Sequence, residues 1–491
     1  MMRRIELAVD ARAALYLIGK ILQGNAATFS VPFFVALLYR ETVIPFLVPA
    51  MISLALGLIA QWATRGEREI GPRESFLVVA VVWLIVAALG AIPFMLAGVL
   101  RPTDAYFEAM SGYTATGASV IADVETQTRS LLIWRAFMQW LGGLGIVVLF
   151  VAIFPRLAVG GRQIMEAEAA WLAQDRLTPR LYQAARSFWG IYIGLTITEA
   201  LLLWGAGLTL YEAVAHAFTT LATGGFSTRN VGVAALPGSV AWIIAPFMIL
   251  GATSFTLMYR ALVGRTLRPF ASDEEFKFFI SILAIATFIL FLNSLGLYRS
   301  IEEALRHSLF QAASIMTTTG FASTDFDKWN ALGKFVLLFL MFFGGCAGST
   351  AGSIKVLRTL IIFKLILREI QRVIHPYRVI PVRLNGRVVP EDAIKSILIS
   401  AVLYVTIFAF GTMLLLIDTT RIGLTLTIAD AASAVATTMG GIGPGFGIVG
   451  PMSTYAELPG TSKALLVFCM WIGRLEIFPV IVLFARSYWK G

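Results

Sequence analysis

Residues 316–326 read MTTTGFASTDF, in which Thr317, Thr318 and Thr319 directly precede Gly320. The surrounding chain is strongly apolar: 58% of its 491 residues are hydrophobic and only 14% are charged, against about 25% charged in a soluble domain. This composition indicates an integral membrane protein. Irregular backbone is tolerated at membrane depth only where protein buries it or water lies against it, so a hydroxyl-rich turn here indicates a site inside the protein.

Long apolar runs flank this stretch on both sides. A transmembrane helix needs about 20 predominantly apolar residues, and hydropathy predicts about ten such spans. They lie at 14–39, 43–63, 76–98, 131–154, 188–210, 239–260, 277–298, 332–350, 394–417 and 462–485. No polar stretch between them is long enough to close a core of its own, so we expect no separate soluble domain.

The pattern around residues 316–326 occurs four times. Each time, a short segment that is too apolar for an ordinary loop and too short to cross a membrane precedes a turn rich in threonine or glycine. We expect each segment to be a short helix between two spanning helices, with turn glycines at 117, 224, 320 and 443. The segments are 103–112, 211–221, 300–316 and 427–437, and the turns are YTATGAS (113–119), ATGGFST (222–228), TTTGFAST (317–324) and TMGGIGPGFG (438–447).

Four such turns, donated by four similar units, are expected to converge on one axis, because each must avoid lipid. Backbone carbonyls around an axis can replace the hydration shell of an ion, and glycine permits backbone dihedrals that a Cβ would oppose. Each short segment also opens with acidic residues, which suit the positive end of a helix dipole and leave the negative end facing the axis. This arrangement favours a cation over an anion. The acidic residues are Asp104, Glu212, Glu302, Glu303 and Asp430.

On these four turns the sequence resembles the Trk/Ktr/HKT superfamily of potassium transporters, most closely its TrkH/TrkG type. The resemblance covers nearly the whole chain and implies an all-α polytopic membrane protein. Its fold would have two leading transmembrane helices plus four fused pseudo-fourfold units of helix, pore helix, filter and helix around one central pore. The implied boundaries are 1–70 for the leading pair and 71–160, 161–265, 266–375 and 376–491 for the four pore units, the third with a broken last helix.

The resemblance also implies a K⁺ selectivity filter made by the four turns. A glycine at the key position of every turn resembles the potassium-selective members, and backbone carbonyls would coordinate K⁺ at Thr116, Thr223, Thr319 and Ile442. The alternative is that the turns only pack helices together, as glycine-rich breaks do in many transporters. The filter residues carried over are Thr114, Ala115, Thr116 and Gly117, then Ala222, Thr223 and Gly224, then Thr317, Thr318, Thr319 and Gly320, and finally Gly440, Gly441, Ile442 and Gly443.

Two further features point to gating. Glycine costs up to about 1 kcal/mol per helical position relative to alanine, so the glycine-rich stretch FFGGCAGSTAGSIKVLR (342–358) should interrupt its helix. By resemblance it is an intramembrane loop beneath the filter that obstructs the pore, although small residues also occur at ordinary helix contacts. The residues concerned are Gly344, Gly345, Gly348, Ser349, Thr350 and Gly352.

The second feature is Arg474, an arginine in the middle of the last apolar run. A charge there costs at least about 2.5–3.5 kcal/mol, so it should face water or a partner. A structural pair with Glu199 or Glu476 is one reading, although Glu476 is two positions away and does not share its helix face. By resemblance, Arg474 points into the pore below the filter and raises the barrier for K⁺.

The basic residues set the expected orientation and partners. Most of the 39 Lys and Arg fall on the side that holds both termini, so the positive-inside rule predicts cytoplasmic termini in what the resemblance implies is the bacterial inner membrane. Segment 355–387 is especially basic, which suits anionic lipid head groups or a docking surface. The resemblance implies a homodimer on a cytosolic ring of nucleotide-binding, TrkA-like subunits. We expect no bound cofactor, K⁺ as the transported ion, and no nucleic-acid partner.

The same residues also bear on other classes of function. The sequence contains no convincing catalytic grouping, and Ser349 with a distant histidine is a poor nucleophile and base. The two cysteines, Cys346 and Cys469, lie in apolar runs and are expected to be small buried side chains. An alternating-access secondary transporter, coupling K⁺ to H⁺ or Na⁺, also uses broken helices but typically has inverted repeats. The parallel repeats therefore favour channel-like permeation.

Overall fold

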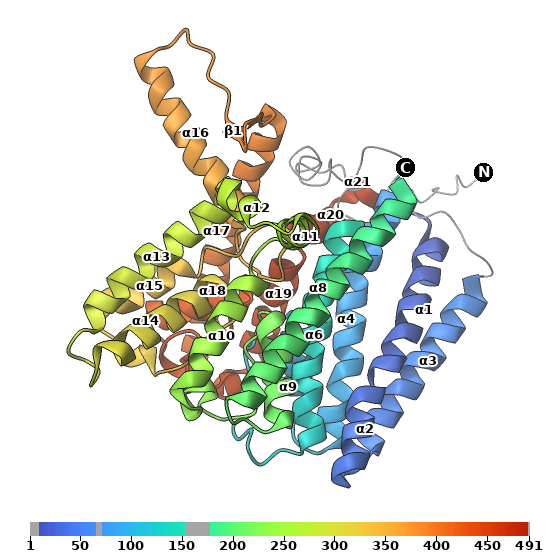
Figure 1. Ribbon diagram of the computed structural model, residues 1–491. Helices are drawn as coiled ribbons and strands as arrows, with labels where there is room; N and C mark the ends of the chain where they lie inside the picture. The colour runs from blue at the N-terminus through green and yellow to red at the C-terminus, as the bar shows by residue number, and fades with distance from the viewer. Residues whose placement is uncertain (1–8, 65–70, 153–176, 490–491) are drawn as a thin grey trace, which may run out of the picture.

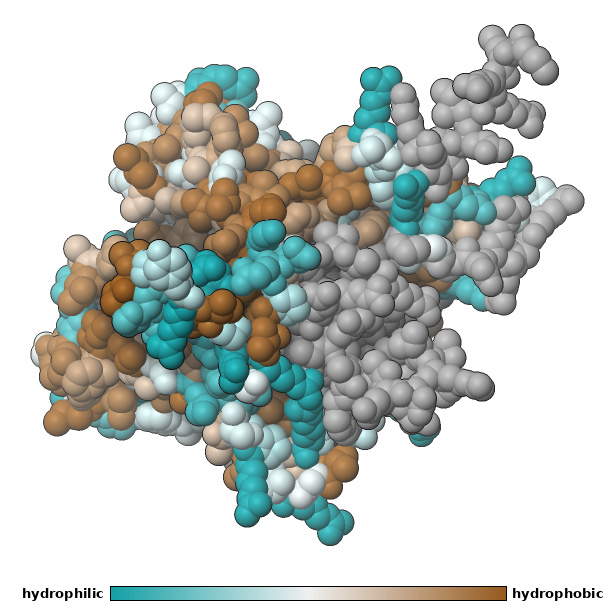
Figure 2. Space-filling model, turned by 90° about the horizontal axis from the view of Figure 1, so that it is seen from above, coloured by the Kyte–Doolittle hydropathy of each residue, from teal (hydrophilic) through white to brown (hydrophobic). Residues whose placement is uncertain are grey.

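The computed structural model describes residues 9–64, 71–152 and 177–489. Long helices lie side by side in these ranges, and α16 and a small β-hairpin project from one end of the molecule (Figure 1). The hairpin pairs β1 (Arg383–Leu384) with β2 (Arg387–Val388) in antiparallel register. Seen from the end from which it projects, the surface mixes hydrophilic and hydrophobic side chains (Figure 2). Such a mixture is expected at an end of a membrane protein, not on its lipid-facing belt.

One sequence of elements recurs four times along the chain: a long helix, a short helix, a turn and a further helix. The four short helices predicted at the sequence level are confirmed, and acidic residues lie in the first turn of each. The repeated elements are α4 (Pro72–Leu96), α5 (Pro102–Tyr113) and α6 (Arg129–Ala152), α8 (Leu177–Gly205), α9 (Leu210–Leu221) and α10 (Gly238–Gly251), α13 (Glu274–Ser294), α14 (Ile301–Met316) and α15 (Ala331–Leu340), and α17 (Glu391–Arg421), α18 (Ile428–Gly440) and α19 (Gly460–Arg474).

The remaining helices precede, follow or connect these elements. The leading helices pack as a pair, and the others continue or join the repeated elements. They are α1 (Ala11–Thr28), α2 (Ser30–Tyr39), α3 (Ile44–Thr64), α11 (Phe255–Gly264), α12 (Arg268–Ser272), α16 (Val356–Ile374), α20 (Phe478–Phe484) and α21 (Arg486–Trp489), with 3₁₀ turns η2 (Gly232–Ala235), η3 (Phe326–Lys328), η4 (Gly447–Val449) and η5 (Tyr455–Glu457).

The helices are those of a membrane protein, but not all of the predicted spans are continuous. In the described ranges, six helices are long and apolar enough to cross a membrane, and up to eight if each bent pair is one span. The predicted span 239–260 bends by 98° between α10 and α11, and 462–485 bends by 115° between α19 and α20. The predicted span 332–350 is helical only to Leu340. Hydropathy does not detect these breaks, because the broken segments remain apolar.

The two ends of the chain share one core. The largest buried cluster joins apolar residues between Ala14 and Met138 with others between Tyr404 and Val480, whereas a second cluster holds the middle of the chain. Contacts between the first and last repeats include a hydrogen bond from the Tyr455 amide to the Ser119 carbonyl (2.8 Å). The repeats are therefore not strung out in a row, because the last one packs back against the first.

Candidate functional site

The four turns that follow the short helices have one backbone conformation. Each has two residues with positive φ, two positions apart, and the residue between them donates its amide to a carbonyl five positions earlier, at 2.8–2.9 Å. The positive-φ pairs are Ala115 with Gly117, Thr223 with Gly225, Thr318 with Gly320, and Gly441 with Gly443. The donors and acceptors are Thr116 to Ser111, Gly224 to Thr219, Thr319 to Ser314, and Ile442 to Thr437.

This pattern corrects the predicted alignment of the second turn by one residue. Gly225, with φ of 76°, occupies the position of Gly117, Gly320 and Gly443, whereas we expected Gly224 there. Consequently Gly224, not Thr223, corresponds to Thr116, Thr319 and Ile442. The sequence does contain a signal for the correct register: a phenylalanine follows the key glycine in both GGF (224–226) and TGF (319–321).

The four turns touch one another in a closed ring. A Cβ placed on Gly117 would lie 2.2 Å from the carbonyl oxygen of Gly224, and one on Gly225 would lie 2.0 Å from that of Thr319. The same construction on Gly320 gives 1.6 Å to Ile442 O, and on Gly443 it gives 2.7 Å to Thr116 O. All four values are below 3.0 Å, which real Cβ atoms essentially never show, so each of the four positions requires glycine for space as well as for its dihedral angle. All four glycines line a single cavity of about 100 Å³.

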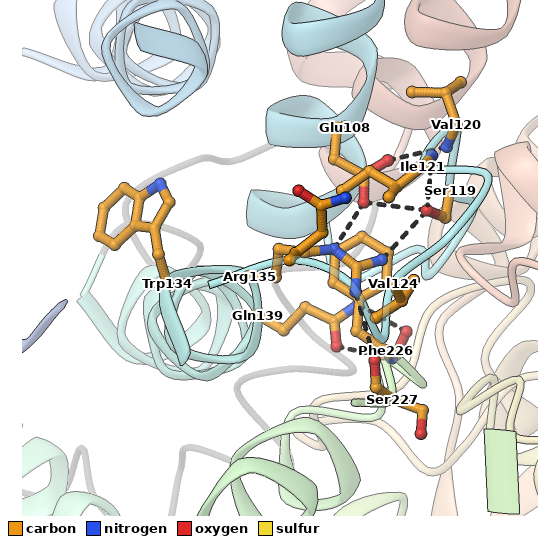
Figure 3. Close-up of polar contacts among 12 residues, drawn as sticks. Glu108, Ser119, Val120, Ile121, Val124, Trp134, Arg135, Gln139, Phe226 and Ser227 are labelled. Carbon is orange, nitrogen blue, oxygen red and sulfur yellow. Dashed lines mark hydrogen bonds and ion pairs between the residues drawn. The ribbon is translucent and has the colours of Figure 1, made fainter. Parts of the chain in front are cut away.

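A buried ion pair holds the first two turns at this cavity (Figure 3). Arg135 of α6 pairs with Glu108 of α5, Nε to Oε1 at 2.7 Å, and the two side chains are 3% and 0% exposed. The guanidinium also donates to Ser119 Oγ at 3.1 Å and to Ser227 O at 3.3 Å, and it lies over the Phe226 ring. Glu108 accepts the amide of Val120 at 2.8 Å. The two groups of the pair thus hold the ends of the first and second turns, at Ser119, Val120 and Ser227.

One helical turn further along α6, Gln139 contacts the second turn directly. Its Nε2 donates to the Gly224 carbonyl at 2.6 Å, and its Oε1 accepts the Phe226 amide at 3.1 Å.

The loops that follow the first and second turns also contact each other. The Asn230 side chain donates to Asp123 at 2.9 Å, and this hydrogen bond lowers the pKa of the Asp123 carboxyl. Arg135, Gln139 and Glu108 were not predicted from sequence, because no local signal distinguishes a polar side chain that contacts a distant turn from one that faces solvent.

Other polar side chains hold the second, third and fourth turns themselves. His216 Nε2 lies 3.0 Å from Ser227 Oγ, and Gln311 Nε2 donates to Ser323 Oγ at 3.2 Å. In the fourth turn, the Tyr455 hydroxyl donates to the Gly443 carbonyl at 2.6 Å. His216 and Gln311 occupy the same place in their short helices as Glu108 does in α5, eight residues before Gly224, Thr319 and Thr116 respectively. None of these residues was among the site residues predicted from the sequence.

Residues 341–355 form a loop that folds against the turns. Phe343 and Ile354 make a parallel β-bridge, and the Gly344 amide donates to the Ile354 carbonyl at 2.8 Å. A Cβ on Gly344 would lie 2.0 Å from Gly352 O, and one on Gly352 would lie 2.2 Å from Gly440 O at the end of α18. The Gly352 amide donates to Thr318 Oγ1 of the third turn at 2.7 Å. The expected interruption of this helix is therefore confirmed, and the interrupted segment packs on the turns.

The other predicted residues of this loop have clear backbone roles. A Cβ on Gly345 would lie 2.6 Å from Ala252 O, and Gly348 has φ of 72°. Ser349 Oγ donates to the Cys346 carbonyl at 2.6 Å, and Thr350 Oγ1 to Leu221 O and Gly251 O at 3.0 and 2.8 Å. These contacts connect the loop to the break between α10 and α11.

Arg474 is buried at the end of α19 and contacts the same loop. Its Nη1 donates to the Thr350 carbonyl at 2.9 Å, and its Nη2 to the Gly142 carbonyl of α6 at 3.0 Å. Glu476 pairs with Arg358 instead, and Glu199 is not among the hydrogen-bond partners of Arg474 in the described part of the chain. The arginine thus joins the loop to α6 through backbone oxygens.

Apolar helices, four matching turns and a shared cavity define a polytopic membrane transport protein. The TrkH family model, described as a cation transport protein, matches residues 45–490, and the chain belongs to this family. It is 35% identical to the Trk system potassium uptake protein TrkH of Salmonella typhimurium, over 98% of this chain and 99% of the relative. It is 33% identical to the Trk system potassium uptake protein TrkG of Escherichia coli, over 94% and 95%.

A solved structure has the same fold. The crystal structure of the potassium transporter TrkH from Vibrio parahaemolyticus superposes with a TM-score of 0.89 at 33% identity, covering 98% of this chain and 99% of the other. The family expected from the four turns is thereby confirmed.

Proposed function

We propose that this protein mediates potassium uptake across the bacterial cytoplasmic membrane by channel-like permeation along the axis of the four turns. The observation that carries the proposal is the closed ring of glycine-to-carbonyl contacts. Four segments with one backbone conformation contact one another, each through its key glycine, and all four key glycines border one cavity. The names of the relatives, which are potassium uptake proteins, support K⁺ as the ion.

In this proposal the four repeats surround one pore as pseudo-fourfold units, and the turns are its selectivity filter. Main-chain oxygens of Thr116, Thr319 and Ile442 take the place of K⁺ hydration water. Gly224 replaces Thr223 as the fourth member of this layer, because the backbone pattern shifts the second turn by one residue. Because glycine has no Cβ, the four turns can lie in close contact. This contact fixes the distances between their carbonyl oxygens.

Residues 341–355 and Arg474 form the gate in this proposal. The loop packs on the third turn and on the end of α18, and Arg474 fixes Thr350 within it. A fixed positive charge next to the ion path raises the barrier for a cation until the loop moves. The basic segment 355–387 and the Trk-system names of the relatives support association with a cytosolic partner, which in this proposal is a nucleotide-binding subunit that controls a homodimer of this chain.

The filter assignment is tested by ion flux in proteoliposomes. Gly320→Ser is expected to lower the preference for K⁺ over Na⁺ by roughly tenfold or more, because its Cβ cannot coexist with the present position of Ile442 O and a displaced carbonyl loses its fitted cation site. Gly443→Ser is the milder variant, with its Cβ 2.7 Å from Thr116 O. The matched control is Gly296→Ser, since Gly296 also has positive φ but has open space around it.

Unchanged selectivity in both filter variants would refute the assignment. Uptake that depends on a Na⁺ or H⁺ gradient with fixed stoichiometry would instead support an alternating-access transporter.

A further inference from the structure

The loop 341–355 is held mainly by backbone groups, hydroxyls and Arg474, but one of its contacts is to a buried carboxylate. Glu275, in the first turn of α13, accepts two backbone amides through Oε1: that of Ala347 at 2.7 Å and that of Leu357 at 3.1 Å. The residue is 4% exposed. Ala347 precedes and Leu357 follows Gly352, the loop residue that contacts the third turn, so a single oxygen fixes both sides of that contact.

The chemistry makes this contact a strong one. Hydrogen bonds to an ionised acceptor are roughly twice as strong as neutral ones, and leaving the two amides unpaired in a buried site would carry a further cost. Burial of the carboxylate is acceptable only while donors surround it. Glu275 and the loop therefore stabilise each other. The loop cannot move away from Glu275 without breaking the bond to Ala347, and the bond to Leu357 fixes the first turn of α16 directly after the loop.

The turn of α13 that presents Glu275 is itself fixed. Asn385, in the β-hairpin, accepts the Glu274 amide at 2.9 Å and donates to Asp273 at 2.9 Å. The Glu274 carboxylate pairs with Lys364 of α16. In Figure 1 the start of α13 lies where α16 and the hairpin leave the body of the molecule. Glu275 therefore connects the loop to the first turn of α13, and contacts with the hairpin and with α16 hold that turn in place.

A cavity lies beside this contact. It has a volume of about 240 Å³, and Glu275, Cys346 and Leu357 all contribute to its wall. Cys346 is 1% exposed in the present conformation. The cavity gives the loop space to move into once the two hydrogen bonds are lost, and it places a thiol at the edge of that space.

We infer that Glu275 is a positioning residue that holds the loop 341–355 closed against the turns. This inference rests on the proposed function, in which that loop is the gate. In this inference the residue acts on permeation through the loop, because its Oε1 holds the amides of Ala347 and Leu357.

The experiment uses the two native cysteines of the full-length protein in proteoliposomes. A small thiol reagent is added, and mass spectrometry follows the modification of Cys346 and Cys469 separately in wild type, Glu275→Ala and Glu275→Gln. Loss of the carboxylate is expected to raise the labelling rate of Cys346 by roughly tenfold or more, since bonds to a charged acceptor are among the stronger ones. Glu275→Gln, which keeps an acceptor oxygen without the charge, should give an intermediate rate.

Two controls separate loop release from unfolding. Cys469, buried in α19, should stay unmodified in every variant that is folded. Asp392→Asn neutralises an exposed carboxylate whose pair with Lys395 is long, at 3.8 Å, and it leaves the bonds to Ala347 and Leu357 intact, so its Cys346 rate should match that of wild type. Equal labelling of Cys346 in wild type and Glu275→Ala, or equal acceleration by Asp392→Asn, would overturn the inference.

Potassium flux is measured on the same vesicles. A several-fold rise in basal flux of Glu275→Ala, with K⁺ preference unchanged, supports both the position-holding role and the gate. Faster Cys346 labelling without any change in flux would support the role of Glu275 and overturn the gate in the proposed function. The two ideas can therefore fail separately.

Discussion

At the scale of single residues, the buried pair of Arg135 and Glu108 is costly to desolvate, and it holds specific groups around the cavity. A buried pair adds little stability in itself, because desolvation offsets the attraction between the charges, but breaking one leaves an uncompensated charge. Here the charges also hold Val120 N, Ser119 Oγ and Ser227 O around the cavity. Arg135 lines that cavity, so the carboxylate of Glu108 also neutralises a positive charge at the place where cations are proposed to pass.

We therefore expect Glu108→Gln to lower both stability and transport. The guanidinium would remain buried without its counter-charge, at a cost of about 3–5 kcal/mol, and its positive charge would reduce K⁺ flux. Thermal unfolding in detergent and flux in proteoliposomes measure the two effects. Asp392→Asn is the control, because its pair with Lys395 is exposed and long, at 3.8 Å. Normal unfolding and normal flux in Glu108→Gln would show that the pair has neither role.

At the scale of elements, the helices that follow the turns approach the short helices through glycine. A Cβ on Gly142 of α6 would lie 2.0 Å from Tyr113 O, and one on Gly473 of α19 would lie 1.9 Å from Met439 O. Both acceptor residues lie in the last turn of a short helix, next to the positive-φ turn. Glycine at these places lets two backbones touch where any side chain would separate them.

Gly473→Ala should consequently be strongly destabilising, although alanine has the better helix propensity. Because the clash is with a backbone atom, α19 would have to move away from α18, and overpacking of this kind costs about 1–3 kcal/mol or more. The yield of folded protein and its unfolding temperature are the measurements. Gly460→Ala provides the comparison, since nothing lies within 4 Å of its Cβ position at the start of the same helix. If both variants unfolded alike, the close approach of α19 and α18 would be unnecessary for folding.

At the scale of the whole molecule, the last repeat closes against the first. Lys463 of α19 pairs with Asp104 of α5 at 2.6 Å and also donates to Ala456 O at 2.9 Å. These residues are 359 positions apart, so the pair forms only when the chain has folded completely. The ring of turns needs this closure, because Gly443 and Thr116 belong to the same two repeats.

A charge exchange tests the closure. Lys463→Asp alone should place two carboxylates together and lower stability by about 1–3 kcal/mol, with a matching loss of K⁺ flux. Adding Asp104→Lys should restore most of both, although a lysine in the first turn of α5 opposes the helix dipole. Unfolding temperature and flux of the two single variants and the double variant give the coupling between the sites. A double variant no better than the sum of the singles would show that the contact contributes nothing to closure.

Much of this architecture can be predicted from the sequence. Hydropathy alone places the chain in a membrane, and the recurrence of short amphipathic segments before threonine- and glycine-rich turns predicts α5, α9, α14 and α18 within a few residues. These signals are local: a helix cap such as Thr209 with Glu212 involves neighbours only. Gly117, Gly320 and Gly443 were found for the same reason, because a positive φ is required by the turn itself.

What tertiary structure decided depends on residues that are distant in the chain. Gly225 takes the key position because Thr319 O approaches it from another repeat, and Gln139 reaches Gly224 from 85 positions away. The breaks after Gly251 and Arg474 lie in apolar sequence, which hydropathy cannot distinguish from continuous helix. Composition and periodicity indicate whether a segment lies in membrane or water and which local backbone structure it forms. The close approach at the glycines, the charge neutralisation and the hydrogen bonding around the four turns arise only when separate repeats come together.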